Sequence, residues 1–139
     1  MQDLKVALVQ TDLVWENKML NLSNIEKSIS LLPADIDVII LPEMFNTGFT
    51  MNPAPNAETM EGVTLMWMKK ISHEKNAVLT GSLIIAEGNG YYNRLIWMLP
   101  DGSYSYFEVK KGKLIFKKDL FNPKSKPSDE INIRPALKP

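Results

Sequence analysis

The chain has 139 residues, of which 45% are hydrophobic. That size allows one compact domain with a buried core and excludes two domains of ordinary size. The chain contains no cysteine and one histidine, which excludes disulfides, thiolate metal sites and a cysteine nucleophile within it and argues against a Ser-His-Asp triad. We therefore expect no metal site and no other cofactor. The sequence shows neither a secretion signal nor a membrane-spanning run, so we expect a cytoplasmic protein.

Charge is divided unevenly along the chain, although the formal net charge is zero. Residues 1–106 contain 7 basic and 12 acidic residues, whereas residues 107–139 contain 9 basic and 4 acidic residues. A lysine-rich tail is usually a solvated segment, and few aromatic residues are present there to stack on nucleic acid bases. We expect no nucleic acid or membrane partner; a tail that binds nucleic acid is the weaker alternative.

The first forty residues predict a strand, a helix and a second strand. Residues 5–10 and 37–41 are short, nearly continuous apolar runs, which are typical of buried strands. Between them, apolar residues recur every three or four positions over residues 17–32, until Pro33 ends the pattern. The expected solution is a right-handed βαβ unit with parallel strands.

The rest of the chain predicts a loop, a helix and an antiparallel meander. The expected elements are a long loop at 46–62, a helix at 64–74, and strands at 77–86, 91–99 and 104–109. The whole pattern indicates an α/β layered domain. Residues 114–116 could add a short strand. Residues 122–139 contain four prolines and few apolar residues, so we expect a mobile tail there.

Glu43 is the first candidate for chemistry because it follows the second predicted strand and precedes the long loop. Ligands of open α/β sheets bind beyond the carboxyl ends of the strands, where a carboxylate can act as a general base. The alternative is a charge that caps a turn or pairs with a nearby cation. His73 lies among polar residues of a predicted helix, which favours a solvated position.

Several motifs in a fixed order extend over about residues 3–107. They include Leu4-Lys-Val-Ala-Leu-Val-Gln-Thr11, Asp37-Val-Ile-Ile-Leu-Pro-Glu-Met-Phe-Asn-Thr-Gly-Phe-Thr-Met51, Thr80-Gly-Ser82, Tyr91-Tyr-Asn-Arg94 and Trp97-Met-Leu-Pro-Asp-Gly-Ser-Tyr104. Together these motifs resemble the N-terminal part of the nitrilase superfamily of carbon-nitrogen hydrolases, and within it the bacterial ω-amidase-like branch.

The resemblance implies the N-terminal portion of a nitrilase-type αββα sandwich, here a mixed sheet with two helices on one face. It also implies a homo-oligomer or a complementing half as partner, and a Glu-Lys-Cys triad that hydrolyses small carboxylic acid amides, such as short dicarboxylic acid monoamides. The cysteine attacks the amide carbon, the glutamate serves as base and the lysine stabilises the oxyanion. Glu43 matches that glutamate, and Phe49 and Thr47 would line the substrate side. Asn93 and Arg94 would give structural support.

The resemblance fails after Tyr106. Val109 occupies the place of the family lysine, and Lys110, one residue later, is the remaining candidate, although one residue turns a strand side chain to the opposite face. We therefore expect a partial hydrolase domain at 1–109 and a divergent basic tail at 110–139. Because the nucleophilic cysteine is absent, we expect this truncated chain to be inactive. The alternative is a noncatalytic binding or assembly module that uses the exposed sheet face.

Overall fold

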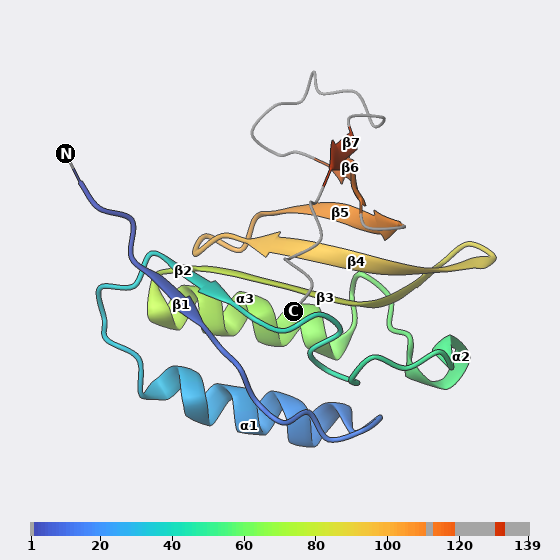
Figure 1. The fold of residues 1–139 in the computed structure, drawn as a ribbon, viewed down its shortest axis with the longest axis horizontal. Coiled ribbons are helices and arrows are strands. Elements are labelled where there is room, and N and C mark those ends of the chain that lie inside the picture. Colours follow the sequence, from blue (N-terminus) through green and yellow to red (C-terminus); the bar gives the residue numbers. More distant parts are fainter. Residues whose placement is uncertain (1, 111–112, 119–129, 133–139) are drawn as a thin grey trace, which may run out of the picture.

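The computed structural model describes residues 2–110, 113–118 and 130–132. Figure 1 shows a mixed sheet with helices on one of its faces. The elements in chain order are β1 (Val6–Leu8), α1 (Lys18–Ser30), β2 (Val38–Ile40), α2 (Pro53–Asn56), α3 (Val63–Lys75), β3 (Val78–Glu87), β4 (Gly90–Met98), β5 (Tyr104–Lys110), β6 (Lys113–Lys118) and β7 (Glu130–Asn132). No helix in the described part of the chain is both long enough and apolar enough to cross a membrane.

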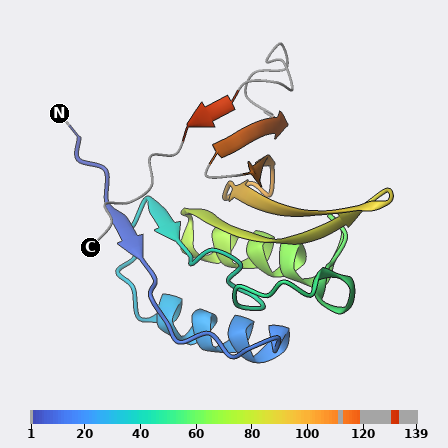
Figure 2. The ribbon, with the colours of Figure 1, turned by 45° about the vertical axis from the view of Figure 1, so that its right-hand side comes forward.

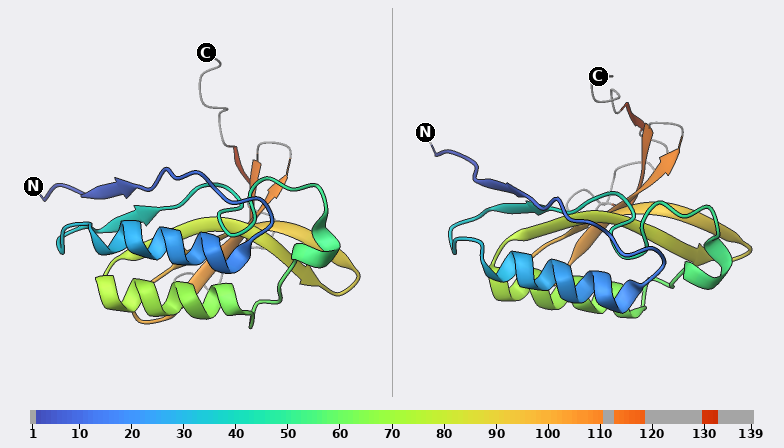
Figure 3. Two further views of the ribbon diagram at one scale, coloured as in Figure 1. Left: turned by 90° about the horizontal axis from the view of Figure 1, so that it is seen from below. Right: turned by 60° about the horizontal axis from the view of Figure 1, so that its bottom comes forward.

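The strands lie in the sheet in the order in which they occur in the chain, from β1 to β7. The β1–β2 and β2–β3 pairs are parallel, and every later pair is antiparallel. Figures 2 and 3 show α1 and α3 side by side on the same face of the sheet. The predicted α/β class, the mixed sheet and the two helices on one face are confirmed.

Both long helices form where the apolar spacing predicts them. The side chain of Asn17 caps α1 by accepting a hydrogen bond from the backbone N–H of Leu20 at 3.1 Å. In α3 the buried positions include Leu65, Met68 and Ile71, which recur every three residues and face the sheet. Asn76 ends α3 in the left-handed conformation, with φ of 48°.

The core lies between these helices and the face of the sheet that they cover. Alternate residues of β3 point toward the helices, and Leu79, Leu83 and Ile85 are all fully buried there. The antiparallel register sets Met98 opposite Leu79 and places it on the same face. A shift of one residue in this register would turn the whole apolar set away from the helices.

Three segments differ from the predicted elements. The loop predicted at 46–62 contains the short helix α2, because Pro53 at its first turn has a backbone angle already suited to a helix. The predicted strand at 114–116 is longer, Lys113–Lys118. Within the tail predicted to be mobile, residues 130–132 form β7, which pairs with β6. The rest of that prediction lies outside the described residues.

The turn after β2 packs tightly against β3 at Gly81. A Cβ atom at this position would lie 2.7 Å from Cδ1 of Phe45 and 2.9 Å from Cβ of Leu41. Phe45 is completely buried, and its ring lies 6.0 Å from that of Trp67 in α3. Only glycine leaves room for Phe45 beneath the turn.

Replacing Gly81 by alanine is expected to displace Phe45 and to lower the free energy of unfolding by about 1–3 kcal/mol, the usual cost of overpacking a core. Urea denaturation followed by tryptophan fluorescence measures the loss. Gly90→Ala is the matched control, because its Cβ would meet the tip of the Tyr92 side chain, which can move. Equal losses in the two variants would contradict the role given to Gly81.

Candidate active site

Glu43 stands on a turn that is held at both ends by backbone hydrogen bonds to one edge of β3, and the loop after the turn returns to the same edge. β2 ends at Ile40. Beyond it, the backbone N–H of Leu41 donates to Thr80 O at 2.8 Å, that of Phe45 to Ser82 O at 3.2 Å, and that of Glu58 to Ile84 O at 3.1 Å. This arrangement fixes both ends of the turn on β3.

Between its two hydrogen bonds to β3, the turn contains more residues than the facing stretch of β3. The acceptors of Leu41 and Phe45 are two residues apart on β3, whereas the donors are four residues apart. The extra residues bend outward, with Met44 in the left-handed region at φ of 50° and its N–H donating to Ser82 Oγ at 2.9 Å. Glu43 is therefore presented at the carboxyl end of β2, as the sequence predicted, and its side chain is exposed.

The carboxylate of Glu43 is held by Asn93 of β4. Asn93 Nδ2 donates to Glu43 Oε1 at 2.9 Å. Because a carboxylate is only an acceptor, the amide nitrogen must face Glu43 and Asn93 Oδ1 must face away. That oxygen is buried and has no hydrogen-bond partner among the residues described. The structure thus gives Asn93, expected only to support the fold, a direct contact with the predicted base.

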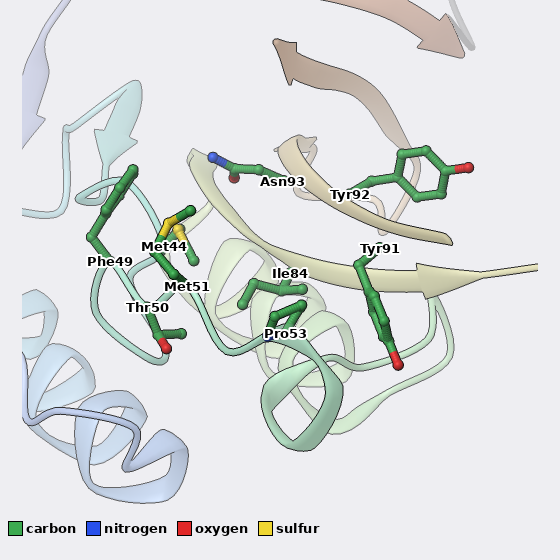
Figure 4. A pocket seen from close by; sticks show the side chains of 9 residues that line it. All are labelled: Met44, Phe49, Thr50, Met51, Pro53, Ile84, Tyr91, Tyr92 and Asn93. Carbon is green, nitrogen blue, oxygen red and sulfur yellow. The ribbon is translucent and has the colours of Figure 1, made fainter. Parts of the chain in front are cut away.

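A pocket of about 250 Å³ lies beside this pair (Figure 4). Its wall is largely apolar and comes from the loop after Glu43 and from β3 and β4. The lining residues are Met44, Phe49, Thr50, Met51, Pro53, Ile84, Tyr91, Tyr92 and Asn93.

The two residues predicted to line the substrate side have different environments. Phe49 lies on the pocket wall and is exposed. Thr47 is completely buried, and its hydroxyl donates to Gly48 O at 2.9 Å. Its carbonyl accepts from the backbone N–H of Glu16 at 2.8 Å. The geometry therefore brings Phe49 to the pocket and uses Thr47 inside the loop.

Lys110 and Glu43 are not brought together. Arg94 pairs with Glu108 across β4 and β5, and Lys110 lies two residues beyond Glu108, with 3.9 Å between its Nζ and Glu108 Oε2. Alternation along a strand puts Lys110 on the Arg94 face of the sheet and Val109 on the Asn93 face. Lys110 as a catalytic residue stays a prediction, and the structure gives it no contact with Glu43.

A buried arginine links β4 to the strands on either side of it. Arg94 is only 2% exposed; its Nη2 donates to Glu87 and, at 3.3 Å, to Glu108 Oε1. Its guanidinium lies 4.6 Å from the ring centre of Tyr106 and 5.1 Å from that of Tyr92. Burial disfavours the charge, but the hydrogen bonds to the two glutamates outweigh it and raise the pKa of Arg94 above its ordinary value.

A polar network fixes the loop that follows Glu43. Asn46 Nδ2 donates to Glu58 Oε2 at 3.0 Å and to Thr64 Oγ1 at 3.1 Å, and Thr64 N donates to Glu58 Oε1 at 2.9 Å. Lys18 Nζ lies 3.3 Å from Glu58 Oε2. Asn21 of α1 donates to the carbonyl of Asn46 at 2.9 Å. The sequence analysis did not predict this network. The signal that could have indicated it is Asn21, a polar residue on the buried face of α1.

Comparison with known proteins identifies the class. The family model of the carbon-nitrogen hydrolases matches residues 5–133, and the chain belongs to this family. The chain is 37% identical over 110 residues to the Omega-amidase YafV of Yersinia enterocolitica and 32% identical over 110 residues to that of Escherichia coli K12. These alignments cover 79% of this chain and 42% of each relative, so the chain spans less than half the length of the relatives it matches.

Solved structures bear out the fold. XC1258 of Xanthomonas campestris, a CN-hydrolase superfamily protein, superposes with a TM-score of 0.77 at 32% identity, over 81% of this chain and 42% of its own. A carbon-nitrogen hydrolase from Helicobacter pylori G27 matches with a TM-score of 0.67 at 15% identity, over 78% of this chain and 40% of its own. The expected N-terminal portion of the nitrilase fold is confirmed.

Replacing Glu58 by glutamine is expected to lower the free energy of unfolding by about 3 kcal/mol. The NH2 group of glutamine would face groups that now donate hydrogen bonds to the carboxylate, and Lys18 would lose its ion pair. Thermal or urea unfolding measures this loss. Glu61→Gln, three residues along and exposed, is the control and should change stability by less than about 0.5 kcal/mol. A loss at Glu58 no larger than the control's would contradict the network.

Proposed function

We propose that this chain forms the N-terminal part of an ω-amidase-like amidohydrolase that acts on small carboxylic acid amides, with Glu43 as the general base. The observation that carries the proposal is the Glu43 carboxylate, which Asn93 holds at the carboxyl end of β2 beside the pocket. The names of the curated relatives support the amidase reading. Short dicarboxylic acid monoamides are the substrates that we propose.

The proposed reaction needs groups that this chain does not contain. Glu43 would take the proton of a cysteine thiol, and the thiolate would attack the amide carbon. Glu43 would then return the proton to the leaving nitrogen, which departs as ammonia, and water would hydrolyse the thioester. The chain has no cysteine, and position 109 offers valine where a cation would stabilise the oxyanion. A further stretch of polypeptide or a second chain must supply the nucleophile.

Two chimeras test this proposal. Residues 1–110 are joined to the C-terminal part of the Yersinia relative, with position 109 either as Val109 or as V109K. We expect ammonia release from a short dicarboxylic acid monoamide to be about 100-fold faster with V109K, because a removed oxyanion donor costs that much. Glu43→Gln in the V109K chimera should lower the rate at least 100-fold.

Two controls accompany the chimeras. V109M, which has a long apolar side chain, should not raise the rate, and Glu61→Gln should leave the active chimera unchanged. The chain alone should release no ammonia, since it has no cysteine to act as the nucleophile. Ammonia release by the unmodified chain, lost on Glu43→Gln, would contradict the expectation that it is inactive.

A second candidate function, an assembly module, is favoured by one surface. Ala7 and Val9 point toward the helices and are buried, whereas Val6 is 44% and Leu8 72% exposed on the opposite face of the sheet. Leu4, just before β1, is also exposed. We propose that a partner covers this apolar row, either a second copy of the chain or a complementing half.

Analytical ultracentrifugation tests this second candidate. The chain is expected to associate as its concentration rises, and Leu8→Lys should abolish the association, because a buried lysine would lose its hydration. Leu31→Lys is the control, since Leu31 is exposed at the end of α1 and away from that row. A chain that stays monomeric at high concentration would rule out self-association.

A further inference from the structure

The turn between β3 and β4 carries Asn89, the one asparagine of the sequence that glycine follows. The register pairs Glu87 with Gly90, so Gly88 and Asn89 form a two-residue turn, in which Gly88 has a φ of 58°. Both turn residues are exposed, and a Cβ atom at Gly88 would meet no other atom within 4 Å. The side chain of Asn89 therefore stands at an open hairpin tip.

An asparagine in this sequence can lose its amide group without an enzyme. The backbone nitrogen of Gly90 attacks Cγ of Asn89, and the bond from Cγ to Nδ2 breaks. Nδ2 leaves as ammonia with the proton of the attacking nitrogen, so a cyclic imide forms. Water then opens either C–N bond of the ring, which gives aspartate or isoaspartate. Glycine favours the attack because it has no Cβ atom to obstruct it.

A second dipeptide capable of forming the same imide, Asp101–Gly102, lies in the turn between β4 and β5. Oδ1 of Asp101 accepts hydrogen bonds from Ser103 N at 2.8 Å and from Ser103 Oγ at 2.5 Å. These bonds, the one from the side chain first, hold the pKa of Asp101 below its ordinary value. An ionised carboxylate is a poor electrophile, and Gly102 N already donates to Leu99 O at 2.9 Å. The structure thus protects Asp101.

Opening of the hairpin tip is the step that the fold controls. Because Gly90 is paired with Glu87, its backbone nitrogen can reach Cγ of Asn89 only when this last pair separates. Local openings of exposed turns cost little free energy, since few buried contacts have to be broken. The tip can therefore open while the rest of β3 and β4 stays paired.

We propose that Asn89 is a site of spontaneous deamidation, through which the folded chain gains a negative charge at the tip of this hairpin as it ages. Isoaspartate would add a backbone atom to a two-residue turn. Tyr91 and Tyr92, which line the pocket, follow directly, so the modified hairpin should hold this wall less firmly. The reaction releases at most one ammonia molecule per site and needs no added amide, which distinguishes it from the proposed hydrolysis.

Ageing of the full chain in a mildly alkaline buffer tests this proposal. Isoelectric focusing should show the gain of one negative charge per molecule, and peptide mass spectrometry should locate it at Asn89 before any other asparagine. Isoaspartate should form at Asn89 faster than at Asp101. An unchanged Asn89 in a chain that has deamidated elsewhere, or equal rates at Asn89 and Asp101, would overturn the proposal.

Three variants of the full chain separate the steps. Asn89→Gln should prevent the early charge change, because glutamine would have to form a larger ring. Gly90→Ala should slow it, and its Cβ would meet only the tip of the Tyr92 side chain, which can move. Ser103→Ala, the matched control, should leave the rate at Asn89 unchanged and raise that at Asp101. The same charge change in Asn89→Gln, or an undiminished rate in Gly90→Ala, would contradict attack by Gly90 on Asn89.

Discussion

Beyond the last residue of β2, the edge of β3 still offers the carbonyl groups of Thr80, Ser82 and Ile84, and buried peptide groups must find partners. Leu41, Phe45 and Glu58 provide them in turn. Between the first two donors the chain makes the short turn that carries Glu43, and between the last two it makes the longer loop that carries one wall of the pocket. The positions of Glu43 and of the pocket are thus both set by hydrogen bonds to one strand edge.

Alternation along β4 and β5 separates two chemical environments by the thickness of the sheet. Asn93 lies on the face of Glu43 and the pocket, whereas Arg94, its neighbour, lies on the other face with Glu87 and Glu108. Arg94 and Glu108 lie opposite one another in the register of the two strands. Because successive residues of a strand alternate between its two faces, position 109 lies on the face of Asn93. One residue along a strand therefore decides which side chains can reach Glu43.

The elements formed by local patterns could be predicted from the sequence. The two long helices, the parallel start of the sheet and the position of Glu43 follow from periodicity and from the end of a strand. The contact between Asn93 and Glu43 could not be predicted, because it joins residues 50 positions apart through the register of three strands. Glu58 was missed for a similar reason: its partners lie in α1, α3 and the loop. Thr47 was assigned to the substrate side through its motif, yet its hydroxyl and carbonyl are used within the protein.

The sheet order repeats the chain order from β1 to β7, and this has a consequence for how the chain folds as it leaves the ribosome. Each new strand finds its neighbour already made, and no strand has to be inserted between two others. Contacts between neighbouring strands are also close in sequence after β3, which favours rapid folding. The N-terminal βαβ unit and the pocket walls can thus assemble during synthesis, before the basic C-terminal residues emerge.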